Sequence, residues 1–151
     1  MKKKITIFLI LIITFLLTGC GDTKASLNTE TFKEKLEAKG FTVVDETSNL
    51  LENTTSVEAY YIASPPEDDY QLNFYMYTNE GTAQAFYAKQ KESLGANGSA
   101  NEISVGNFSK YTLIGNGKFS VVSRVGSTLL YTTVDEYYRT QVNDLIKEIG
   151  Y

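Results

Sequence analysis

Histidine and tryptophan are absent from this 151-residue sequence, and cysteine occurs only once. Histidine is the most common general acid or base in enzymes, and a cysteine thiolate is a common nucleophile. Without histidine, a zinc site would have to be built from carboxylates alone, which is an unusual ligand set. We therefore expect no catalytic residues, no metal site, no cofactor and no enzymatic activity.

Positive charge is also scarce. The chain has 14 Lys and Arg residues against 18 Asp and Glu residues, and three of its lysines stand at positions 2–4. Without those three, 11 basic residues face 18 acidic ones and the formal net charge falls from −4 to −7. Nucleic-acid binding requires clustered basic residues that neutralise phosphates, so we expect no nucleic-acid partner.

The sequence lacks an apolar run of the roughly 20 residues that a transmembrane helix needs. Its longest apolar stretch, Ile5–Leu17, is broken only by Thr6 and Thr14 and follows the N-terminal lysines. A basic segment followed by an apolar segment of this length is the arrangement of a secretory signal peptide.

The stretch Leu17-Thr18-Gly19-Cys20 ends this segment and contains the only cysteine. It resembles the lipobox of bacterial lipoproteins. The resemblance implies cleavage after Gly19, a diacylglyceryl group on Cys20, and anchoring at the outer, extracellular face of the cytoplasmic membrane. The many Lys, Ile, Asn and Tyr residues and the absence of Trp and His are typical of an AT-rich Gram-positive genome. Two acyl chains are enough for stable anchoring. The alternatives are an uncleaved anchor, or a secreted protein in which the cysteine is accidental.

Three segments follow from this interpretation. Residues 1–19 form the signal peptide, residues 20–26 form a lipidated polar tether, and residues 27–151 form one globular domain. The length of the third segment is that of a single domain, and it contains no cysteine for disulfide bonds.

Residues that typically begin and end helices predict three amphipathic helices in the domain. The first begins at Asn28 or Thr29 and is closed by Gly40. The second spans Thr82–Leu94 and starts from Asn79 or Thr78, and the third runs from about Asp135 to Gly150.

Alternating apolar residues and short Gly- or Asn-containing turns predict strands joined by hairpins, with a polar loop at Thr47–Ser56. The fold class is therefore α+β, a largely antiparallel sheet of about six to seven strands with three helices. This layout resembles small surface lipoproteins of Gram-positive bacteria with unassigned function. The predicted strands are 41–46, Val57–Ser64, Tyr70–Thr78, Glu102–Val105, Phe108–Ile114, Lys118–Val125 and Thr128–Val134.

Tyrosines on two adjacent predicted strands form the candidate binding face. In the second of these strands, Tyr75 and Tyr77 alternate with core residues and must point away from them. Tyr60 lies on the preceding strand. Aromatic rings with a polar tip are enriched at interfaces, so this face can bind a protein, a peptide or a glycan. The alternative is that a helix covers these rings and makes them an outer core.

Charged residues give weaker signals. We interpret Lys110, Lys118 and Arg124 as ordinary surface charge rather than a basic patch. The acidic turn 67–69 lacks the spacing of a calcium loop and is interpreted as a solvated hairpin tip.

The function expected from the sequence is therefore a lipid-anchored, non-catalytic binding or accessory module at the cell surface. Two alternatives stay open: a cell-envelope enzyme that uses carboxylate, Ser or Lys residues, and a protective lipoprotein for immunity or exclusion. The oligomeric state does not follow from the sequence.

Overall fold

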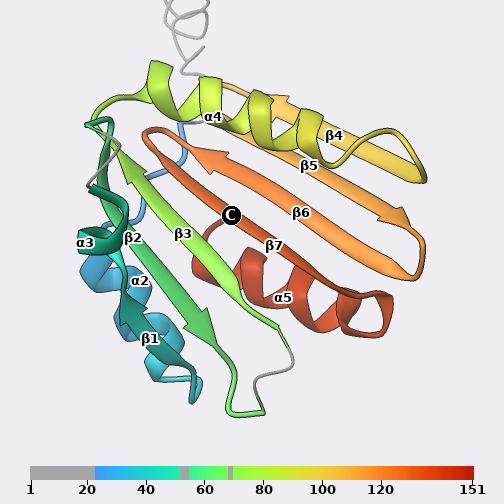
Figure 1. Cartoon of the computed structure of the whole chain (residues 1–151), viewed down its shortest axis with the longest axis horizontal. Helices are drawn as coiled ribbons and strands as arrows, with labels where there is room; N and C mark the ends of the chain where they lie inside the picture. Colours follow the sequence, from blue (N-terminus) through green and yellow to red (C-terminus); the bar gives the residue numbers. More distant parts are fainter. Residues whose placement is uncertain (1–22, 52–54, 68–69) are drawn as a thin grey trace, which may run out of the picture.

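The computed structural model describes residues 23–51, 55–67 and 70–151. These residues form one seven-stranded sheet in which every neighbouring pair is antiparallel, in the order β1-β2-β3-β7-β6-β5-β4 (Figure 1). The strands are β1 Thr42–Asp45, β2 Val57–Ser64, β3 Leu72–Tyr77, β4 Ser99–Val105, β5 Phe108–Gly115, β6 Lys118–Val125 and β7 Thr128–Asp135. The helices are α2 Thr29–Glu37, α3 Thr47–Leu51, α4 Glu80–Ser93 and α5 Arg139–Ile149, with a short 3-10 helix η2 at Glu136–Tyr138.

The hairpins of the second half follow from their turn residues. Asn116 and Gly117 have φ angles of 53° and 71° and join β5 to β6, the backbone that a tight two-residue hairpin turn requires. Strand β7 then closes against β3, where Phe74 pairs with Leu130. This single long-range pairing joins the two halves of the chain into one sheet.

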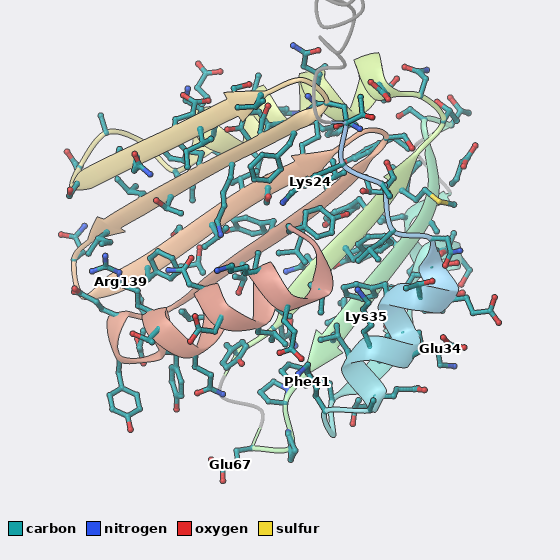
Figure 2. The ribbon with its side chains drawn as sticks, turned by 180° about the vertical axis from the view of Figure 1, so that it is seen from behind. Lys24, Glu34, Lys35, Phe41, Glu67 and Arg139 are labelled. Atoms are coloured by element: carbon teal, nitrogen blue, oxygen red, sulfur yellow. The ribbon has the colours of Figure 1, made fainter. Side chains whose placement is uncertain are left out.

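Helices α2 and α5 cover one face of the sheet, which we call the back face (Figure 2). The ring of Phe32 in α2 stacks on Phe74 of β3 with centroids 4.3 Å apart. From α5, Val142, Ile146 and Ile149 are fully buried in the same cluster. Burial of such side chains stabilises the fold by about 1.5–3 kcal/mol each.

Helix α4 lies on the opposite, front face and covers only one end of it (Figure 1). Its buried residues Ala83 and Tyr87 pack on Tyr77 of β3, Val122 of β6 and Leu129 of β7. The helix begins at Asn79, whose side chain accepts a hydrogen bond from the Thr82 backbone N–H at 2.9 Å. Towards the other end of β2, β3 and β7, no described helix lies over the front face (Figure 1).

The prediction of a single α+β domain with a largely antiparallel sheet is confirmed. The prediction of three helices is wrong, because the described residues contain a fourth, α3, inside the predicted polar loop. Tertiary contacts stabilise this short helix: Asp45 accepts the Thr47 N–H at 2.9 Å, and the Thr47 hydroxyl accepts the Tyr60 N–H at 3.0 Å. A five-residue helix of this kind has no pattern of its own to predict it.

Several element boundaries also differ from the prediction, most of them by one or two residues, and the two largest differences are at β4 and α5. Strand β4 begins at Ser99 rather than Glu102, and α5 begins at Arg139 after the 3-10 turn rather than at Asp135. Cys20, the signal peptide and the lipobox lie outside the described residues. Within the described ranges, none of the helices has the length and hydropathy needed to cross a membrane.

Candidate functional site: an open tyrosine surface

Two tyrosines face each other across the β2–β3 ladder on the front of the sheet. Tyr60 pairs with Tyr75 in register, and their rings stack with centroids 4.5 Å apart and planes inclined by 10°. Tyr75 is in turn 6.1 Å from Tyr77, and Tyr77 stacks on Phe86 of α4 at 4.8 Å. The four rings form a continuous row from strand β2 to helix α4.

The three tyrosines of the predicted binding face lie in this row but differ in exposure. Tyr77 is only 3% exposed because Phe86 of α4 covers it, so at this position the outer-core alternative holds. Tyr60 and Tyr75 are half-buried, and Tyr75 lies beside α4, where it lines a hollow together with Phe86, Lys89 and Gln90. Of the three predicted tyrosines, Tyr60 and Tyr75 are therefore partly exposed, while Tyr77 is buried beneath Phe86 of α4.

Two further residues belong to this surface and were not singled out from the sequence. Asn73 of β3 accepts a hydrogen bond from the Tyr60 hydroxyl at 2.8 Å, and its amide group donates to the Tyr131 carbonyl at 3.5 Å. Tyr131 of β7 shares a hydrogen bond with Thr133 at 3.1 Å. We call Tyr60, Asn73, Tyr75 and Tyr131 the open tyrosine surface.

The sequence alone was enough to place Asn73 on this face of the sheet, but not Tyr131. Asn73 alternates with core residues in the same register as Tyr75, so its side of the sheet was predictable. Tyr131 joins the surface only because β7 pairs with β3, where Tyr131 lies opposite Asn73. That pairing is set by tertiary structure, and no local pattern indicates it.

The open tyrosine surface is electrically neutral. Burial raises the pKa of the Tyr75 hydroxyl well above its usual value, and the neighbouring Tyr60 hydroxyl raises it further. The pKa of Tyr77 is likewise raised by burial. These hydroxyls therefore stay protonated at physiological pH, and the surface offers uncharged donors, acceptors and ring faces.

A hollow of about 230 Å³ adjoins the surface on the α4 side. Tyr75, Tyr77 and Phe86 line one part of it, and Lys89 and Gln90 of α4 lie at its border. This depression extends the ring row with apolar walls, a setting in which aromatic anchors of a partner are buried.

The three basic residues considered from the sequence, Lys110, Lys118 and Arg124, do not form a common patch. Arg124 is only 5% exposed under α4, where its Nη1 donates to the Gly126 carbonyl at 3.1 Å, so its interpretation as ordinary surface charge is wrong. Lys110 occupies the opposite face of the sheet, and Lys118 forms an exposed ion pair with Asp135. Strand register explains why Lys110 and Arg124 are on opposite faces: Lys110 pairs with Ser123 and shares its face, whereas the next residue, Arg124, points the other way.

Groups suited to catalysis do not converge among the described residues. In residues 23–51, 55–67 and 70–151, no three His, Cys, Asp or Glu residues come close enough to hold a metal ion. Ser123, the neighbour of Lys110 across the β5–β6 ladder, is fully buried and its hydroxyl donates to the Ser109 carbonyl at 3.4 Å. Asp68 and Asp69 of the acidic turn lie outside the described residues.

No protein family model matches this chain, and no curated protein matches it significantly. A crystal structure described as a GTP binding regulator from Thermotoga maritima superposes with a TM-score of 0.49 and 17% sequence identity. The superposition covers 82% of this chain and 85% of that chain. A likeness at this level transfers no residue role and no activity.

Proposed function

We propose that this protein is a lipid-anchored surface lipoprotein that binds an uncharged partner through the open tyrosine surface, without catalysing a reaction. One observation carries the proposal: helix α4 leaves the stacked pair Tyr60 and Tyr75 partly exposed on the front of the sheet. Half-buried rings fixed by neighbours can bury a large area on binding at a small entropic cost.

The chemistry of the surface supports a neutral partner. Its four residues present ring faces, hydroxyls and one amide, and burial keeps the Tyr75 hydroxyl protonated by raising its pKa. A protein, peptide or glycan surface with hydroxyl or amide groups complements these side chains. A strongly charged partner would lose hydration without gaining an opposite charge.

The segment that precedes the first helix is hydrogen-bonded to one end of the sheet, which is consistent with a lipid anchor at that end. The Lys24 backbone N–H donates to the Asn107 side chain at 2.9 Å, and the Asn107 amide donates to the Lys24 carbonyl at 2.8 Å. Cys20 precedes Lys24 by four residues, a span of at most about 14 Å. A lipid on Cys20 would therefore hold the β4–β5 turn close to the bilayer.

The binding proposal is tested by capture from a cell-envelope fraction with immobilised full-length protein. Wild type is compared with Tyr60→Ala, Tyr75→Ala and the control Tyr137→Ala, which removes a ring that is 89% exposed on η2. We expect material that wild type and the control retain and that both surface variants lose. Protease or periodate treatment of the captured material then distinguishes a protein or peptide from a glycan. Equal capture by all four proteins would refute the tyrosine surface.

The anchoring proposal is tested separately with Cys20→Ala. Wild type should lose residues 1–19, gain the mass of a diacylglyceryl group and sediment with membranes, whereas the variant should show neither processing nor lipid mass. Release of both proteins without lipid would mean that Cys20 is a free thiol, and the anchoring would be wrong even if the tyrosine surface binds.

A further inference from the structure

A second hollow, of about 440 Å³, lies on the back face of the sheet, between strands β4 and β5 and the start of α5. Helix α5 packs over β6 and β7 and leaves this part of the sheet uncovered (Figure 2). Lys110 of β5 lines the hollow on the side of the sheet. Arg139, the first residue of α5, lines it on the side of the helix (Figure 2).

The charges in this hollow are unbalanced. Its described lining contains two cations, Lys110 and Arg139, and no carboxylate. Within the described part of the chain, neither side chain makes an ion pair or a hydrogen bond. The whole sequence is acidic, with a net charge of −4, so partners of opposite sign are plentiful elsewhere.

Keeping the ammonium group of Lys110 charged at this position costs free energy. Burial lowers the pKa of its ammonium group, and the charge of the nearby Lys24 lowers it further. The Lys24 ammonium itself lies 3.9 Å from the centroid of the Phe108 ring. Cations that are partly desolvated without a counter-charge are destabilising unless an anion compensates them.

Uncharged hydrogen-bonding groups complete the hollow. Asn101 of β4, Thr112 of β5 and Asn143, one turn after Arg139, contribute amide and hydroxyl groups to its lining. Ile114 and Phe119 supply apolar walls beside them. The combination of two cations, several neutral donors and an apolar wall suits a small molecule with one anionic group and an organic body.

We propose that this hollow binds the phosphate group of a small phosphate ester, with Lys110 and Arg139 supplying the positive charge and Asn101, Thr112 and Asn143 supplying hydrogen bonds. A phosphate has three or four terminal oxygens and can use more of these donors at once than a carboxylate with two. Arginine matches phosphate geometry with its fork of N–H groups, and lysine serves as a compact point charge. The site lies on the opposite face from the open tyrosine surface, so either proposal can fail while the other stands.

The test is isothermal titration calorimetry on the full-length protein in detergent solution, at constant ionic strength, with inorganic phosphate, glycerol 3-phosphate and acetate. The variants are Lys110→Gln and Arg139→Gln. The matched control is Lys147→Gln, which removes the same charge from the exposed last turn of α5. Lys110→Arg keeps the charge, and circular dichroism reports whether each variant is folded.

We expect saturable binding of phosphate and of the ester, weakened about tenfold or more by either Gln variant and less than about twofold by the control. Lys110→Arg should retain most of the affinity, and acetate should bind more weakly than phosphate. Absence of saturable binding, or an equal loss in the control variant, would overturn the site. Acetate binding as tightly as phosphate would overturn the assigned ligand class. If Lys110→Gln does not fold, the phosphate affinity of Arg139→Gln, at an exposed position, tests the site instead.

One further titration identifies the source of the phosphate group. Glycerophosphoglycerol is a water-soluble phosphodiester with the headgroup chemistry of a phospholipid and no acyl chains. A diester keeps only two terminal oxygens, so we expect it to bind more weakly than glycerol 3-phosphate. Tighter binding of the diester would assign a lipid headgroup as the ligand and would overturn the argument from the number of terminal oxygens. The reverse order would support a soluble phosphate monoester.

Discussion

Tyr60 and Tyr75 hold each other in place on the front of the sheet, with stacked rings 4.5 Å apart and a hydrogen bond from the Tyr60 hydroxyl to Asn73 at 2.8 Å. Stacked aromatic pairs contribute about 0.5–1.5 kcal/mol beyond the area that they bury. The amide of Asn73 reaches on to the Tyr131 carbonyl, so the pair is tied to strand β7 as well. The surface is therefore ordered before a partner arrives, which lowers the entropic cost of binding.

The hydroxyl of Tyr60 should contribute to stability separately from its ring. Tyr60→Phe keeps the stack with Tyr75 and removes the hydrogen bond to Asn73, and we expect a loss of about 0.5–1.5 kcal/mol in the free energy of unfolding. Urea unfolding measures this loss. Tyr137→Phe, at an exposed ring, is the control and should be neutral. In a double-mutant cycle with Asn73→Ala, additive losses would show that the hydroxyl and the amide do not interact.

Stability should fall steeply in alkaline solution. Burial raises the pKa of Tyr75, Tyr77, Tyr87 and Tyr151 in the folded protein, whereas an unfolded tyrosine ionises near pH 10. Above that pH the unfolded chain releases protons that the folded protein retains, so the free energy of unfolding decreases as pH rises. Each such tyrosine contributes a slope of about 1.4 kcal/mol per pH unit. Below pH 9 these groups should produce no pH dependence.

Urea unfolding between pH 8 and pH 11 checks this, and Tyr151→Phe provides the matched comparison. Tyr151 is buried, and its hydroxyl donates to the Thr128 hydroxyl. The variant should lose stability at pH 8 but show a shallower decline above pH 10. An unchanged slope would mean that Tyr151 ionises in the folded protein as readily as in the unfolded chain.

Local features of the fold were predictable because neighbouring residues determine them. Asn28 and Asn79 both cap their helices through the side-chain oxygen, as their positions indicate. Gly150 ends the last helix with a φ of 115°, a conformation that favours glycine. The Asn116–Gly117 turn specifies its hairpin in the same way. Each of these features depends on a few adjacent residues.

Features that depend on distant pairing were not predictable. The contact of β7 with β3 brings Tyr131 next to Asn73, and only the folded sheet determines it. The position of α4 decides that Tyr77 is buried and that Tyr75 stays partly exposed, although both point to the same face. Arg124 is also buried, and its neighbours along the chain gave no reason to expect this.

Glu102 should connect strand β4 to α4 through a pH-dependent contact. Its carboxylate pairs with the Lys91 ammonium and accepts a hydrogen bond from the Tyr87 hydroxyl at 3.0 Å. The hydrogen bond from Lys91 is the main cause that lowers the pKa of Glu102, against an opposing effect of burial. A lowered pKa means that the contact stabilises the fold above the usual glutamate pKa and that this stabilisation is lost as pH falls through the folded value.

Replacement of Glu102 by Gln should therefore reduce the acid sensitivity of the protein. Both partners are about one-third exposed, so solvent screening limits the effect to below about 1 kcal/mol at pH 7. The measurement is urea unfolding at pH 7 and pH 3, with Glu136→Gln as the control at an exposed site on η2. Glu102→Gln should be less stable than wild type at pH 7 and nearly equal at pH 3. The same difference at both pH values would assign the effect to packing rather than charge.

Gly115 should be indispensable where the start of β4 passes the end of β5. A Cβ on Gly115 would lie 2.2 Å from the Asn97 carbonyl oxygen, and one on Gly98 would lie 2.1 Å from the Ile114 carbonyl oxygen. Backbone cannot give way as a flexible side chain can, so Gly115→Ala should cost about 1–3 kcal/mol through overpacking. Gly117→Ala is the control for backbone strain alone, since its φ is +71° and, apart from its chain neighbours, nothing lies within 4 Å of the position of its Cβ.

The two glycine variants should also differ in their affinity for phosphate. Ile114 precedes Gly115 and lines the back-face hollow, as does Ser99, which follows Gly98. Pushing the two strands apart would move both walls, so Gly115→Ala should weaken phosphate binding measurably, whereas Gly117→Ala should leave it unchanged despite its own loss of stability. Equal affinities in the two variants would show that the spacing of β4 and β5 does not determine the shape of the hollow, and Lys110 and Arg139 would then have to account for binding by charge alone.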